Sequence, residues 1–125
     1  GGGVALLRCL SALDDVDAEG DEAVGVDIVR KAVRRPLKQI AENAGKDGSI
    51  TLERVMEKEG NFGYDAAADE YTDLMERGVI DPAKVVRIAL QNGTSVANML
   101  LSTDAVISEL DEDEDEGGGH GPHAH

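Results

Sequence analysis

Five basic side chains fall within nine residues of this chain and could in principle contact phosphate groups. They are Arg30, Lys31, Arg34, Arg35 and Lys38. Helical spacing, however, spreads them around one side of a helix, with Asp27 a turn from Lys31 and Glu42 a turn from Lys38. The whole chain carries a formal net charge of −14, which repels nucleic-acid backbones. We therefore interpret the basic residues as a solvated helix face, and we expect no nucleic-acid partner.

Two further groups have side chains that could do chemistry. His120, His123 and His125 follow the acidic run 111–116 and could bind Ni²⁺ or Zn²⁺ weakly, but a solvated tail or a purification remnant is the favoured interpretation. The single cysteine, Cys9, cannot form an internal disulfide, and its apolar surroundings favour a packed thiol over a nucleophile. These residues predict neither a catalytic group nor a resident metal.

The first half of the chain has helical periodicity. Residues 4–13 form an apolar stripe, and residues 22–43 form a second, longer one through Val26, Val29, Val33, Leu37, Ile40 and Ala44. Pro36 lies inside the second stripe and predicts a kink or a break near Arg35. Gly45 stands where a helix commonly ends.

The middle of the chain has shorter predicted elements, which include a strand. Ser49 is positioned to cap a short helix over residues 50–59. Residues 62–65 have aromatic side chains two positions apart, which predicts a short strand or one arm of a hairpin. Residues 70–76 are ambiguous between strand and helix, and Gly78 marks a turn.

Asp81-Pro82 is the strongest local signal, since Asp is favoured as an N-cap and Pro at the first helical position. We predict a helix over residues 82–101, then a strand over residues 105–110. Residues 111–125 are acidic and then rich in Gly and His, so a disordered tail is expected.

Composition limits the remaining possibilities. One Phe, two Tyr and no Trp leave the core to Val, Leu, Ile, Ala and Met, which favours closely packed helices. No apolar run approaches the ~20 residues that cross a bilayer, so no membrane partner is expected. The absence of an initiator Met and of a signal peptide predicts a piece of a longer protein. The lone cysteine is compatible with the reducing cytoplasm, and a cytoplasmic location is expected.

Seven blocks of the sequence occur in the order and with nearly the spacing of one known family. They are residues 1–6, 35–40, 43–45, 60–67, 78–85, 89–92 and 95–97. Together they resemble the GroEL family of group I chaperonins, over about residues 1–110. The resemblance implies the C-terminal half of the equatorial, ATP-binding domain: a mostly α-helical bundle with a short β-hairpin and a terminal β-strand, followed by the tail 111–125.

The same resemblance implies a function for the parent protein. Group I chaperonins are double heptameric rings that assist folding by enclosing non-native polypeptides under a GroES-like lid, driven by ATP and Mg²⁺. The ATPase belongs to the protein-folding isomerase class. In that family the phosphate loop and the Mg²⁺ and water-activating aspartates precede the segment that resembles Gly1, so the chain by itself is expected to be inactive.

The resemblance also assigns nucleotide contacts to eight residues. They are Gly2, Ile40, Tyr64, Asp65, Ala66, Ala67, Val79 and Asp81. It implies that the Gly2 backbone meets the ribose, that Ile40 and Val79 form apolar walls, and that residues 64–67 wrap the adenine. Asp81 would accept hydrogen bonds from the ribose hydroxyls.

One of these residues departs from the family. Many relatives have Asn where this chain has Asp65, whose carboxylate can accept a hydrogen bond from the adenine amino group but cannot donate one. Each residue also has a plain structural interpretation: Asp81 as a helix cap, Ile40 as core, Tyr64 as a hairpin aromatic, and residues 1–3 as a loop or a cloning remnant. The alternative function is a non-enzymatic helical interaction module that binds partners through the small residues Ala89, Gly93 and Ala97 or through the strand 105–110.

Overall fold

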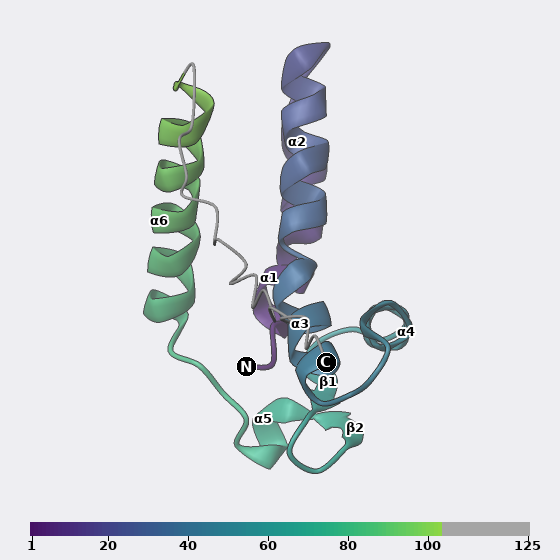
Figure 1. Cartoon of the computed structure of the whole chain (residues 1–125). Helices are drawn as coiled ribbons and strands as arrows, with labels where there is room; N and C mark the ends of the chain where they lie inside the picture. Colours follow the sequence, from purple (N-terminus) through teal and green to yellow (C-terminus); the bar gives the residue numbers. More distant parts are fainter. Residues whose placement is uncertain (104–125) are drawn as a thin grey trace, which may run out of the picture. The chain divides into compact units, whose positions relative to one another are not determined.

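The computed structural model describes residues 1–103, and the strand predicted at 105–110 and the tail 111–125 lie outside this range. The described chain falls into two units, Gly1–Leu90 and a second that begins at Gln91. In order, the elements are α1 (Val4–Arg8), the 3₁₀ helix η1 (Cys9–Asp15), α2 (Asp21–Ala32), α3 (Arg35–Asn43), α4 (Gly48–Met56), β1 (Phe62–Asp65), β2 (Glu70–Asp73), α5 (Leu74–Arg77) and α6 (Ala83–Leu101) (Figure 1). Within residues 1–103 the fold is mostly helical with one antiparallel two-stranded sheet, as predicted.

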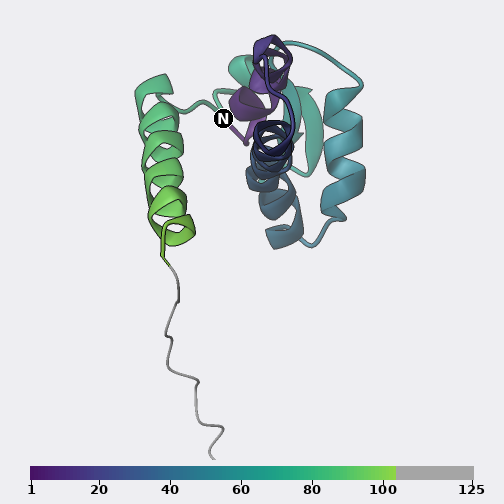
Figure 2. The same ribbon diagram turned by 90° about the horizontal axis from the view of Figure 1, so that it is seen from above.

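The core of the first unit is small and almost entirely aliphatic. It joins α1, α3, α4, the hairpin and α5 through Val4, Leu7, Leu37, Ala41, Leu52, Val55, Tyr64 and Leu74. Helices α3 and α4 pack against each other, and the hairpin lies alongside α4 (Figure 2). By contrast, α2 has no buried residue and extends away from this group in Figure 1.

The long stripe predicted over residues 22–43 is divided, as Pro36 indicated. Helix α2 ends at Ala32 and α3 begins at Arg35, so Pro36 occupies the first turn of a new helix, where its missing N–H costs nothing. The stripe itself is correct at Val33 and Leu37, which are buried. It is wrong at Val29 and Ala44, which are both exposed. On the last turn of α3 the fully buried residue is Ala41 instead.

Both ends of the connection between α3 and α4 are fixed by hydrogen bonds. The Gly45 amide donates to the carbonyl of Glu42 and the Lys46 amide to that of Ala41, which is the glycine-terminated helix end expected from Gly45. The predicted cap Ser49 is wrong. Asp47 is the N-cap of α4, and its Oδ1 accepts from the amides of Ser49 and Ile50, both at 2.9 Å.

The hairpin and its continuation resolve the ambiguity at 70–76. Residues 70–73 form β2, and the chain then makes the single turn α5, because Asp73 caps it by accepting from the amides of Met75 and Glu76. The predicted turn residue Gly78 ends α5 with a φ of 76°. The four-residue segment 79–82 then leads to α6.

Candidate nucleotide-binding site

Three consecutive glycines precede α1, and their backbone lies against α3. Gly3 has a φ of 77°, and a Cβ added there would stand 2.7 Å from the backbone nitrogen of Leu37. No real side chain tolerates such a distance to backbone atoms, so only glycine lets this turn approach α3 so closely. The glycine turn is therefore a packed part of the fold.

The same turn meets two other segments that carry predicted site residues. A Cβ on Gly2, whose φ is 62°, would lie 3.0 Å from Cδ1 of Leu74 and 3.5 Å from the carbonyl oxygen of Tyr64. A Cβ on Gly1 would lie 2.4 Å from the carbonyl oxygen of Val79. The glycine turn thus brings Gly2, Tyr64 and Val79 together from distant parts of the sequence.

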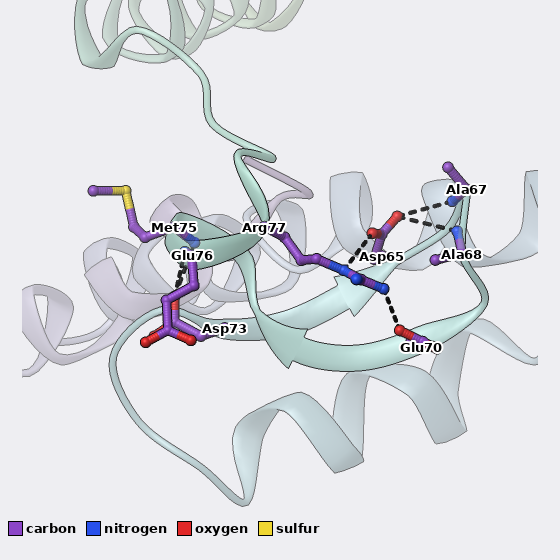
Figure 3. Close-up of polar contacts among 8 residues, drawn as sticks. All are labelled: Asp65, Ala67, Ala68, Glu70, Asp73, Met75, Glu76 and Arg77. Carbon is purple, nitrogen blue, oxygen red and sulfur yellow. Dashed lines mark hydrogen bonds and ion pairs between the residues drawn. The ribbon is translucent and has the colours of Figure 1, made fainter.

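The next three predicted residues belong to the hairpin end. Asp65 and Glu70 are the last cross-strand pair, and residues 66–69 connect them. Oδ1 of Asp65 accepts from the amides of Ala67 at 3.1 Å and Ala68 at 3.2 Å, while Oδ2 faces Nε of Arg77 at 3.6 Å (Figure 3). The carboxylate is thereby engaged in shaping the loop, and Asp65 is only 8% exposed.

Tyr64 points its side chain away from any surface. The residue is 3% exposed, and its hydroxyl donates to Oδ1 of Asp69 at 2.9 Å. Lys46, from the turn between α3 and α4, donates to Oδ2 of the same carboxylate at 2.7 Å. The ring of Tyr64 therefore belongs to the core, and little of the residue is open to a ligand.

Charge and burial set the protonation of this second network. The hydrogen bonds from Lys46 and Tyr64 lower the pKa of Asp69, and the Asp69 carboxylate raises the pKa of Lys46. Burial, followed by the hydrogen bond to Asp69, raises the pKa of the Tyr64 phenol. At neutral pH the network is an ion pair with a neutral phenol donating to it.

Asp81 lies on the surface rather than at a helix cap. The Pro82 carbonyl accepts the first helical hydrogen bond, from the amide of Val85 at 3.0 Å, so Asp81 precedes the cap position and the predicted N-cap is wrong by one residue. Its carboxylate makes no hydrogen bond or ion pair within residues 1–103. It lines a cleft of about 380 Å³ together with Gly1, Val79 and Arg8.

Ile40 does not line this cleft. It is half-buried on α3, one turn beyond Leu37. The structure thus groups Gly2, Tyr64 and Val79 at the glycine turn, places residues 65–67 at the hairpin end, and sets Asp81 on the cleft beside Gly1. Ile40 lies on α3, apart from both of these groups.

The sequence alone did not indicate three charged residues of this site: Lys46, Asp69 and Arg77. Asp69 has a φ of 57°, the only described non-glycine residue with a positive φ, and an Asp in a short loop between two strands could have suggested this. The ion pairs themselves join residues 23 and 12 positions apart, a spacing that no helical or strand pattern contains.

Two classes of function receive no support from the described residues. Between Gly1 and Thr103 there is no cluster of three side chains suited to hold a metal ion. In the same range no helix has the length and apolar character needed to cross a membrane.

The comparison with protein families gives a match over most of the chain. Residues 1–110 match the model of the TCP-1/cpn60 chaperonin family, which is the span over which the chaperonin resemblance was recognised. The match covers far more than half of the 125 residues. The chain therefore belongs to the TCP-1/cpn60 chaperonin family.

Proposed function

We propose that this chain forms the base and ribose side of an ATP site in a group I chaperonin, an ATPase that assists protein folding. The observation that carries the proposal is the glycine turn. It brings the backbone of Gly2 close to the carbonyl of Tyr64 and that of Gly1 close to the carbonyl of Val79, beside a cleft that Gly1, Val79 and Asp81 line. Such a surface suits a flat base and a sugar, which need close main-chain approach and a few well-placed polar groups.

Asp81 is the polar group best suited to the ribose. Its carboxylate has no partner within residues 1–103, so it can accept hydrogen bonds from two adjacent hydroxyls without breaking an existing contact. The hairpin end would supply the base contacts through the main chain of Ala66 and Ala67, and Val79 and Ile40 would supply apolar contacts. Mg²⁺ would accompany the phosphates of ATP, and no ligand for it is assigned within residues 1–103.

The assembly follows from the same proposal. The parent protein would form a double heptameric ring in the cytoplasm, receive non-native polypeptides and close with a GroES-like lid. Membership of the chaperonin family supports this assignment. The group I form rests on the seven sequence blocks described above.

A second candidate is a helical interaction module without nucleotide binding. It is favoured by α6, where Val85, Met99 and Leu101 are at least 60% exposed. The two candidates differ in what the cleft beside Gly1 does. An interaction module needs no affinity for adenosine.

A titration of the ¹⁵N-labelled 125-residue chain separates them. We expect adenosine and ATP at millimolar concentrations to shift the amide signals of Gly2, Ala66, Ala67 and Val79, and tripolyphosphate to leave them unchanged. Guanosine serves as the control for general base stacking. Shifts caused by tripolyphosphate alone, or no shift with adenosine, would reject the nucleotide proposal and favour the interaction module.

A further inference from the structure

Arg77 connects two segments of the candidate site. It is the last residue of α5, and its guanidinium reaches back across the hairpin to Asp65 at the end of β1 and Glu70 at the start of β2 (Figure 3). The Asp65 contact is an ion pair of 3.6 Å between Nε and Oδ2, and a terminal nitrogen of Arg77 donates to Oε2 of Glu70. One side chain therefore holds both strands at the point where the loop 66–69 begins and ends.

The two acidic residues need this cation. Asp65 and Glu70 are directly opposite each other in the antiparallel register, and like charges in that position repel. Glu70 is 58% exposed and partly screened by water, whereas Asp65 is only 8% exposed, where water screens charges less effectively. Arg77 is the only cation that forms an ion pair with either carboxylate within residues 1–103.

The position of Arg77 in the chain gives this contact a second effect. Gly78 follows directly, and then come Val79 and Asp81, the residues of the apolar wall and the ribose contact. The Val79 amide donates to the carbonyl of Leu74 at 2.9 Å, which closes α5 and fixes the direction in which the chain leaves it. Arg77 thus ties the segment 79–81 to the loop that contains Ala66 and Ala67.

We infer that Arg77 is a positioning residue of the nucleotide site, which acts through Asp65 and Glu70 to set the base loop 66–69 relative to the segment 79–81. This inference rests on the proposed function. It does not require Arg77 to touch the ligand. The Lys46–Asp69 pair also contacts the loop, but it ties the loop to the turn after α3 and has no connection to residues 79–81.

The test uses four versions of the 125-residue chain. Arg77→Gln removes the cation, and Arg87→Gln makes the same change on α6, where the arginine forms no ion pair within residues 1–103. The third variant combines Arg77→Gln with Glu70→Gln, which removes the cation together with one of the two opposed carboxylates. Adenosine affinity is measured by amide-shift titration, and the exchange rates of the Ala67 and Ala68 amides are measured without ligand.

We expect Arg77→Gln to speed exchange of the Ala67 and Ala68 amides and to weaken adenosine binding, each by about threefold to tenfold, as for loss of a partly buried ion pair. Arg87→Gln should match the unmodified chain. The double variant should recover adenosine affinity to within about twofold, because a single carboxylate has no opposed charge to repel it. Such recovery distinguishes positioning by charge from a general loss of packing.

The outcomes separate this inference from the proposed function. If the unmodified chain binds adenosine and Arg77→Gln binds it equally well, the positioning role is wrong and the nucleotide site stands. If Arg77→Gln weakens binding and the double variant stays as weak, positioning by charge is also wrong. If the unmodified chain does not bind adenosine, the proposed function fails, and the inference fails with it.

Discussion

The hydroxyl of Tyr64 and the ammonium group of Lys46 bind the two oxygens of one carboxylate, Asp69, at 2.9 Å and 2.7 Å. This arrangement joins a buried strand residue to an exposed turn between two helices. It also makes the stability of the hairpin end depend on pH. The direction of each pKa change determines where that dependence lies.

At alkaline pH we expect the Tyr64 contact to be lost. Burial and the hydrogen bond to Asp69 raise the pKa of Tyr64 above its ordinary value of 10.0, so the stabilisation is complete below that value and is lost as pH rises through the raised pKa. Lys46, whose pKa is also raised, acts in the same direction. Denaturant midpoints measured across this range should fall more steeply for the unmodified chain than for Tyr64→Phe, which keeps the ring. Parallel curves would show that the phenol ionises without a stability cost.

Gly3→Ala should destabilise the first unit by about 3–5 kcal/mol, since it combines a left-handed backbone with a Cβ 2.7 Å from the backbone of Leu37. Gly45→Ala is the matched control. Gly45 has nearly the same φ, 76°, but a Cβ there meets no atom within 4 Å, so only the backbone strain of about 1 kcal/mol remains. Chemical denaturation measures both. Equal losses would mean that the glycine turn is not in close contact with α3.

Asp81→Ala should weaken adenosine binding by roughly tenfold, because two ribose hydroxyls lose a charged acceptor. The unfolding free energy should hardly change, because the carboxylate has no partner within residues 1–103. Asp65→Asn should have the smaller effect on binding, about threefold, since its Oδ1 can still accept from the loop amides. Calorimetry or amide-shift titration gives the ranking. A reversed ranking would move the polar contact from Asp81 to the hairpin.

The 125-residue chain should release no phosphate from ATP above background. The residues assigned to the nucleotide contact base and ribose, whereas hydrolysis requires charge stabilisation at the γ-phosphate. A coupled phosphate assay with the Asp81→Ala variant as a contaminant control measures this. Steady release that disappears in the variant would reveal a catalytic group that the present assignment lacks.

Local sequence signals predicted much of the fold. Pro36 marked the division between α2 and α3, Gly45 marked a helix end, Gly78 marked a turn, and the aromatic spacing of 62–65 marked a strand. Some errors concerned burial: Cys9, expected to be a packed thiol, is exposed, as is Val29. Others were errors of position. Asp47 rather than Ser49 caps α4, and the helix after Asp81 begins at Ala83. A cap depends on which side chain reaches the free amides, and neighbouring polar residues compete for that place.

The candidate site was less predictable from sequence. A family resemblance could assign Gly2 or Asp81, but residue types alone could not show that a Cβ on Gly1 would strike Val79, or that Asp65 is already engaged by two amides and Arg77. Such contacts depend on tertiary approach. They join residues whose separation in sequence has no regular period.

Arg8 carries a consequence for the order in which this chain can fold. Its guanidinium donates to the carbonyls of Val55, Gly60 and Phe62, which lie 47 to 54 positions later in the sequence. During synthesis α1 therefore leaves the ribosome long before its acceptors exist, and a five-residue helix is too short to persist alone in water. The full set of Arg8 hydrogen bonds must wait until β1 has emerged. A nascent chain that stalls before Phe62 lacks Tyr64 and Leu74, which complete the core that buries Val4 and Leu7.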